Sequence, residues 1–568
     1  MKRLISRILF LSVCVVLGFG VADTLAGQER EYEWNDVERI VAVGDIHGAY
    51  DNLVELLQNA RLIDDDLRWI GGEAHLVQNG DIPDRGPHSR KAMDLLMKLE
   101  EQAEDSGGRV HVLIGNHEAM NVVGIVDLVS AEEYEAFVDR DSGKRRDRFF
   151  ERYYEQLRRE ARKKNEDAPK NSDARREFDS KYPLGFIEHR QAFGAEGKYG
   201  KWIREHNTSI KINGTLFSHG DWSEKFSVLG VEDVNRTIRL ELSGELPIEE
   251  GLTFDEVSPL QYRGLAQTEL TRAAQASTAP LVDRVLQNLG AKRMVVGHTL
   301  TGGVIESRFG GKHISIDVGM LELYYGGHRI ALEIVDDELR AIHDGGTIRI
   351  PETMDESNID AYYDDVAAVD PTNLDVQLKR VDRLQEQGAT DQMVAVLEVL
   401  VELHPTYIPF RYRDVLGTAY QDRGETARAK TQFEAYIDGL AALGKANPEN
   451  LNLANLLARF CVNKGLRLDL AEEAIARAVD ASPENFSFRL TMARLRLAKQ
   501  EYSRVLEVLD ATQVSAPFVY ERHYLRGLAF VGLNETDEAR IAFQEAIDAS
   551  PEQREAREAL SRLIATPN

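Results

Sequence analysis

The sequence predicts an α/β domain built on a largely parallel sheet, followed by an all-α domain of stacked helical repeats. Three short apolar segments, at residues 40–43, 75–78 and 110–114, each end in a glycine and a polar residue, and amphipathic helices follow the first two. This alternation is typical of parallel strands with functional residues at their carboxyl ends. Beyond residue 372, small and aromatic residues recur at fixed intervals. A chain of 568 residues is also too long for one hydrophobic core.

Further strands, an insertion and a linker are expected around this first pattern. The strands are expected at residues 215–218, 294–296, 314–316 and 330–334. Residues 131–212 are rich in Arg and Lys and carry an aromatic stripe formed by Phe149, Phe150, Tyr153 and Tyr154. We favour a solvated helical insertion that buries this stripe over a cap that attracts phosphate. Residues 351–371 contain acidic residues and neither Lys nor Arg, which is typical of a linker.

The N-terminal residues 1–26 have the pattern of a secretory signal peptide. Basic residues precede an apolar run at residues 8–21, and small residues follow up to Ala26. We therefore expect a periplasmic or secreted protein. The alternative is that an uncleaved segment remains as an N-terminal membrane anchor.

The charge balance limits the classes of partner. The formal net charge is −26, whereas binding to a nucleic-acid backbone needs a basic surface. No nucleic-acid partner is therefore expected.

Residues 372–568 are expected to form a solenoid of tetratricopeptide repeats. The small and aromatic spacing of such a helix pair is clearest at Gly527, Phe530, Ala539, Phe543, Ala546 and Pro551. The last four of these have counterparts two periods of 34 residues earlier, at Ala471, Ile475, Ala478 and Pro483. Solenoids of this kind present a concave surface, so a protein or peptide partner is expected for the repeats.

Five short motifs place oxygen and imidazole ligands at expected strand ends. They are Gly44-Asp45-Ile46-His47-Gly48, Gly80-Asp81-Ile82-Pro83-Asp84-Arg85-Gly86, Gly115-Asn116-His117-Glu118, Ser218-His219-Gly220-Asp221 and Gly297-His298-Thr299. Carboxylates mixed with imidazoles suit divalent metals such as Mn, Fe or Zn, and six candidate ligands exceed the needs of one tetrahedral site. We therefore expect two divalent metal ions, bridged by Asp81 on the middle of the first three strands.

The first three motifs resemble the signature of the calcineurin-like metallophosphoesterases and, within them, of the phosphoprotein phosphatase family. The third motif continues as Ala119-Met120-Asn121, and this extension and the segment Ser258-Pro259-Leu260-Gln261-Tyr262-Arg263-Gly264 are similar to the Shewanella-like branch of that family. The resemblance implies an α/β metallophosphoesterase sandwich with helices on its outer faces, which we expect over residues 36–350.

The resemblance also implies a role for each site residue. One metal would be held by Asp45, His47 and Asp81, and the other by Asn116, His219 and His298. The implied reaction is attack of a metal-bridging hydroxide on phosphorus, with His117 as general acid and Asp84 orienting it. Arg85 and Arg263 would bind the phosphate, because guanidinium groups match phosphate oxygens bidentately.

Two positions depart from the pattern of the family. Asp221 stands where a second glycine is common, which is expected to alter the local loop. Leu300 stands where many diesterases and nucleases of the superfamily have a second histidine, which argues against those activities. Asp317 and Tyr325 either border the site or are ordinary turn residues.

The expected function is hydrolysis of phosphomonoesters, either small ones or phosphoproteins carrying phosphotyrosine or phosphoserine/threonine. The first alternative is a hydrolase of nucleotides or dinucleoside polyphosphates, which shares the first three motifs. The second is an inert scaffold whose repeats carry the function. The Arg263 segment and the repeats favour protein substrates, and the intact ligand set with His117 argues against an inert scaffold.

Overall fold

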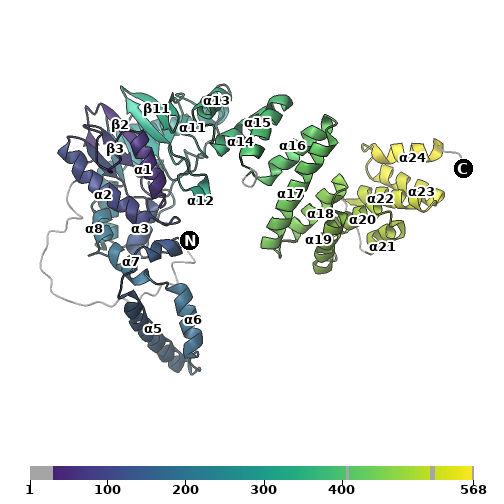
Figure 1. Ribbon diagram of the computed structural model, residues 1–568, viewed down its shortest axis with the longest axis horizontal. Helices are drawn as coiled ribbons and strands as arrows, with labels where there is room; N and C mark the ends of the chain where they lie inside the picture. The colour runs from purple at the N-terminus through teal and green to yellow at the C-terminus, as the bar shows by residue number, and fades with distance from the viewer. Residues whose placement is uncertain (1–29, 405–407, 512–517, 566–568) are drawn as a thin grey trace. The chain divides into compact units, whose positions relative to one another are not determined.

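The computed structural model describes residues 30–404, 408–511 and 518–565 (Figure 1). The predicted signal peptide therefore lies outside the described residues. The chain divides into two compact units, one ending at Arg383 and the other beginning at Leu384.

Two six-stranded sheets form the centre of the first unit. One has the order β12-β11-β10-β2-β3-β4, with strands Gly346–Arg349, Glu338–His343, Ala331–Val335, Arg39–Val43, His75–Gln78 and Arg109–Val112. The other has the order β1-β5-β6-β7-β9-β8, with strands Glu33–Trp34, Ser209–Ile212, Thr215–Ser218, Arg293–Val296, His313–Ser315 and Glu306–Arg308. Strands β2, β3 and β4 are parallel, as the alternation predicts, and all four of the later strands form.

The two sheets pack face to face, and the side-chain alternation of β2 shows how. Ile40 and Ala42 belong to the apolar cluster between the sheets, together with Phe217 of β6. Val41 and Val43 belong to the cluster under the helices instead. Because successive residues of a strand face opposite sides, an almost wholly apolar strand is expected where both faces are buried.

Helices cover the outer faces of the sandwich. Helices α1, α2 and α3 span Tyr50–Asn59, Ser89–Asp105 and Asn116–Val123, and α9, α10, α11 and α12 span Glu224–Ser227, Val231–Ser243, Arg272–Leu289 and Glu322–Tyr325. Leu56 of α1 and Leu96 of α2 pack with Leu76 of β3, and Val285 of α11 packs with Met294 of β7 in the same core. The predicted sandwich with outer helices is confirmed.

The predicted insertion is largely helical, but its last residues, Ser209–Ile212, form strand β5 of the second sheet. Helices α4 to α8 span Ala131–Glu135, Ser142–Lys164, Asn171–Lys181, Phe186–Phe193 and Lys198–Arg204. The aromatic stripe of α5 packs against Phe178 of α6, whose ring centre lies 5.2 Å from that of Phe150. Most basic side chains of α5 are exposed around this small core.

The segment expected to be an acidic linker is more ordered than that prediction implies. Helix α13 occupies Ile359–Val369, and Tyr362 and Val366 are buried with Val304. Asp364 forms an ion pair at 2.7 Å with Arg380 of the next helix, α14 (Leu374–Glu386). The acidic residues thus occupy one side of an amphipathic helix, a pattern that the charge count alone conceals.

The second unit consists of paired helices. Helices α15 to α24 span Thr390–Leu403, Phe410–Asp422, Thr426–Ala446, Leu451–Lys464, Leu468–Ala481, Phe486–Ala498, Tyr502–Asp510, Val519–Gly532, Thr536–Ala549 and Glu555–Ala565. A side chain at Gly417 or Gly527 would collide with the ring of Phe433 or Phe543, so the repeated glycine lets two helices approach closely. Within the described ranges, every helix is too short or too polar to cross a membrane.

Candidate metal centre and active site

The carboxyl ends of the central strands of both sheets meet at one edge of the sandwich. Asp45 follows β2, Asp81 follows β3 and His298 follows β7. The backbone N–H of His298 donates to Asp45 Oδ1 at 2.9 Å, which joins the two sheets at this edge. Asp81 and His298 adopt φ values of 58° and 62°, in the left-handed region, and the backbone turns sharply at each of them as it leaves its strand.

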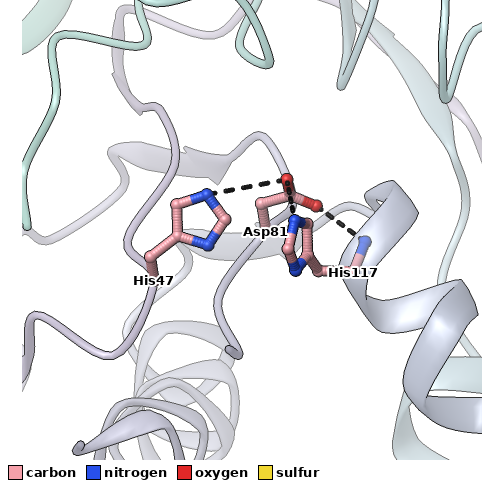
Figure 2. Close-up of side chains that lie close together, drawn as sticks. All are labelled: His47, Asp81 and His117. Atoms are coloured by element: carbon pink, nitrogen blue, oxygen red, sulfur yellow. Dashed lines mark hydrogen bonds and ion pairs between the residues drawn. The ribbon is translucent and has the colours of Figure 1, made fainter. Parts of the chain in front are cut away.

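Asp81 is the common member of two groups of potential metal ligands. One group contains His47 and His117, and the other contains His219 and His298. Figure 2 shows the Asp81 carboxylate between the imidazole rings of His47 and His117. Its Oδ2 lies 3.8 Å from His47 Nε2 and 3.3 Å from His219 Nε2. Asp81 is thus common to both groups, and its role as the bridging ligand stays a prediction.

Backbone carbonyls orient three of these imidazoles. His47 Nδ1 lies 3.1 Å from Pro83 O, His219 Nδ1 lies 2.8 Å from Asn79 O, and His298 Nε2 lies 3.2 Å from Gln261 O. Such a contact fixes the proton on the outer nitrogen and leaves the lone pair of the other nitrogen facing inward. The three rings therefore present metal-ligating atoms to the centre, and the donor set fits divalent cations.

The remaining predicted ligands lie beside these rings. Asn116 Oδ1 is 2.9 Å from His219 Nε2, and that nitrogen is 2.9 Å from His298 Nδ1. Asp45 Oδ2 is 3.8 Å from His47 Nε2. All six predicted ligands are thus brought together, although the distances alone group His117 with His47 and Asp81.

Burial and charge set the protonation of the centre. Burial lowers the pKa of His47 to about 3, and burial with the neighbouring His219 lowers the pKa of His298 to about 2. Both imidazoles are therefore neutral near pH 7, which is the form that binds metal. Burial opposes ionisation of Asp81, but the nearby His219 and His117 hold the pKa of this carboxyl well below its usual value. Burial also lowers the pKa of His219, but Asp81 outweighs it and raises that pKa to about 9, so this imidazole must lose a proton when it binds a metal.

His117 and Asp84 form a second arrangement beside the ligands. His117 Nδ1 donates to Asp84 Oδ2 at 2.6 Å, and Asn121 Nδ2 donates to Asp84 Oδ1 at 2.8 Å. Burial lowers the pKa of His117, but Asp81 and Asp84 outweigh it and raise the pKa above its ordinary value. His117 can therefore hold a proton near neutral pH.

The two predicted phosphate-binding arginines lie beside different histidines. Arg85 Nη2 is 3.3 Å from His117 Nε2, whereas Arg263 Nη2 is 3.3 Å from His298 Nδ1. Arg85 Nη1 also donates to the hydroxyl of Tyr325. Tyr325 therefore borders the site. Arg85 and Arg263 are both half-buried.

Two acidic side chains, Glu118 and Asp221, support the backbone around the site. Glu118 accepts backbone N–H groups of Asp81 and Ile82 at 2.8 and 2.7 Å, which fixes the turn that carries Asp81. Asp221 accepts the N–H groups of Leu265 and Ala266 at 2.6 and 2.8 Å.

Asp221, which was expected to alter its local loop, thus anchors the backbone of the segment that follows Arg263. His313 supports this anchor, because its Nε2 lies 2.6 Å from Asp221 Oδ1. Asp317 is also buried near the predicted metal ligands, and burial together with Asp81 raises the pKa of its carboxyl to about 6.

Comparison with known proteins agrees with this geometry. Calcineurin-like phosphoesterases match residues 38–302, and a tetratricopeptide repeat-like domain matches residues 452–564. Shewanella-like protein phosphatase 1 of Plasmodium berghei (strain Anka) is 27% identical over 321 residues, covering 55% of this chain and 75% of that protein. Shewanella-like protein phosphatase 2 of Arabidopsis thaliana is 28% identical over 317 residues, covering 53% and 76%.

A solved structure is also similar to part of the chain. The cold-active protein-tyrosine phosphatase of a psychrophilic Shewanella species is 25% identical, with a TM-score of 0.42, and the match covers 60% of this chain and 88% of that one. The curated relatives and the family matches carry the assignment. The chain is a phosphatase with a calcineurin-like phosphoesterase domain, related to the Shewanella-like protein phosphatases and followed by a tetratricopeptide repeat-like domain.

Proposed function

We propose that this phosphatase uses two metal ions to hydrolyse phosphomonoesters, and that phosphorylated proteins are its physiological substrates. One observation carries the proposal. The Asp81 carboxylate lies among the inward nitrogens of three oriented histidines, and the His117–Asp84 pair lies directly beside it.

The ligand assignment follows from the two sides of Asp81. Asp45 and His47 with Asp81 would hold one cation, and Asn116, His219 and His298 with Asp81 would hold the other. When bound, two divalent cations such as Mn, Fe or Zn lower the pKa of water and offset charge on a phosphoryl group.

The surrounding side chains complete the reaction. Arg85 and Arg263 would bind phosphoryl oxygens from two sides of the centre. The leaving oxygen then needs a proton, which His117 would donate from Nε2 while Asp84 holds Nδ1. The raised pKa of His117 supports this role, because the ring must be protonated when the ester bond breaks.

Protein substrates are supported by the names of two curated relatives, which are protein phosphatases. The test compares an aryl phosphate, phosphotyrosine and phosphoserine peptides, and a dinucleoside polyphosphate, each with metal-stripped protein before and after addition of Mn, Zn or Fe. We expect metal-dependent hydrolysis of the monoesters and little reaction with the dinucleotide. Preferential hydrolysis of the dinucleotide would establish the alternative function.

The repeats and the N-terminal segment extend the proposal. The repeats would bind a protein or peptide partner, so a cognate phosphoprotein should show a lower KM than the phosphopeptide cut from it. Equal KM values would argue against that role. Residues 1–26 would direct export, and N-terminal sequencing of the mature protein from a periplasmic or secreted fraction should begin after them. Sequencing would find Met1 if the segment were retained.

A further inference from the structure

The first turns of helix α14 contact two loops that carry residues of the proposed active site. The His298 loop, residues 298–304, begins with a proposed metal ligand. The Tyr325 loop, residues 318–328, carries the tyrosine that contacts Arg85. Asn373, Asp375 and Lys379, at the start of α14, lie beyond the phosphoesterase match, which ends at residue 302.

The His298 loop is held by two donors from this helix. Lys379 Nζ donates to the carbonyl of Thr301, three residues after His298. Asn373 Nδ2 donates to the carbonyl of Gly303 at 2.7 Å. Asn373 is buried, and a Cβ atom at Gly303 would lie 2.6 Å from its Oδ1, so the contact is closely packed.

The Tyr325 loop is held by a hydrogen bond between two side chains. His328 Nε2 lies 2.8 Å from Asp375 Oδ2, and the His328 side chain is buried. The N–H groups of Gly327 and His328 both donate to the carbonyl of Gly319 at 3.1 Å, which closes the base of this loop. Asp375 therefore contacts the closing end of the loop at His328, three residues after Tyr325.

The two loops are also joined to each other. The N–H of Thr301 donates to the carbonyl of Asp317 at 2.9 Å, and the N–H of Gly303 donates to that of Val318 at 3.1 Å. A shift of one loop is thereby passed to the other. Lys379 Nζ also lies 3.8 Å from Glu306 Oε1, so an acidic side chain lies close to the Lys379 ammonium group.

We propose that Asn373, Asp375 and Lys379 are positioning residues for phosphate-ester hydrolysis, which hold His298 and Tyr325 in their working places. This inference rests on the proposed function of the site. The residues needed for catalysis would then extend beyond residue 371, since these three residues lie after the segment expected to be a linker.

The test uses the full chain with two altered residues and a control on the same helix. Lys379→Met keeps the length of the side chain but removes the donor to Thr301. Asn373→Asp retains an acceptor for the N–H of Val376, so it preserves the start of α14 while removing the donor to Gly303. Arg380→Met is the control, because Arg380 pairs with Asp364 of α13 and not with either loop.

Three quantities are measured for each variant, namely kcat for an aryl phosphate, Mn binding to the metal-stripped protein, and amide hydrogen exchange of both loops. We expect Lys379→Met and Asn373→Asp to lower kcat about tenfold or more, because small displacements of reacting groups are costly. Both should weaken Mn binding and speed exchange in residues 298–304 and 318–328, while Arg380→Met changes none of these.

The inference is overturned if the two loop variants retain wild-type kcat and loop exchange, or if a lower melting temperature is their only change. Hydrogen exchange in the metal-free protein is independent of catalysis. A wild-type protein without phosphatase activity would therefore refute the proposed function, whereas unchanged exchange in the variants would refute the positioning role.

Discussion

His117 Nδ1 lies 2.6 Å from Asp84 Oδ2, and Asn121 holds the other oxygen of that carboxylate. The imidazole is therefore fixed in orientation and its pKa is raised, while its Nε2 lies 3.7 Å from Asp81 Oδ2 among the proposed metal ligands. A general acid needs a protonated group held at a fixed position, and the His117–Asp84 pair supplies one beside the candidate metal ligands.

The first prediction concerns this proton donor. His117→Asn should lower kcat by roughly a hundredfold or more while the protein retains its metal, because the change removes a proton and not a required ligand. Kinetics with aryl phosphates of graded leaving-group pKa provide the measurement. The loss should shrink for good leaving groups. Metal loss in this variant would instead assign His117 to the ligands, as the distances alone allow.

The second prediction concerns the two arginines. Arg85→Lys and Arg263→Lys should each weaken binding of inorganic phosphate about tenfold, the effect of losing roughly one charge-assisted hydrogen bond. Calorimetric titration of phosphate into the metal-loaded protein measures this. Arg90→Lys is the control, since Arg90 donates to the carbonyl of Ala136 at the surface. Unchanged phosphate affinity in either site variant would remove that arginine from the phosphate site.

The third prediction concerns pH and Glu133. Burial, and then the neighbouring Asp84, raise the pKa of this carboxyl to about 8 in the folded state. Its ionisation is therefore easier in the unfolded chain, and stability from this group is lost as pH rises from about 4.5 toward 8. Glu133→Gln should make the fall in melting temperature over this range smaller than in the wild type. An identical fall in both proteins would contradict the raised pKa.

The fourth prediction concerns the repeats. Gly527→Ala should destabilise the helical unit by about 1–3 kcal/mol, because the added methyl group overlaps the ring of Phe543. Gly444→Ala, in the helix α17, is the control, since a Cβ atom there meets no neighbour within 4 Å. That change should be neutral or stabilising by about 0.5–1 kcal/mol. Chemical denaturation measures both, and equal effects would argue against close packing at Gly527.

Much of the fold and the grouping of the candidate site residues could be predicted from local patterns. Each ligand-bearing motif follows a strand, and parallel strands end at one edge, so Asp45 and Asp81 were expected to meet there. The supporting groups could not be predicted in this way. Asp221 and His313 are 92 residues apart and only the fold joins them. Glu118 acts through backbone N–H groups, and no sequence spacing records such a contact.

The linker prediction differed from the structure for a related physical reason. Counting charges over residues 351–371 ignores the side of the helix on which they lie, and Tyr362 and Val366 form a buried face opposite the acidic residues. The role of Lys379 was likewise hidden, because its partner is a backbone carbonyl at Thr301 and not a side chain of opposite charge.

The most direct test of the central claim is metal content and turnover of Asp81→Asn. Asp81 is the member shared by both ligand groups, so removing its charge should affect both metal positions. The wild-type protein should bind two divalent metal ions per chain by elemental analysis. The variant should bind fewer and lose nearly all aryl phosphatase activity while keeping its melting temperature near that of the metal-free wild type. Full metal content with normal turnover in Asp81→Asn would contradict the two-metal account.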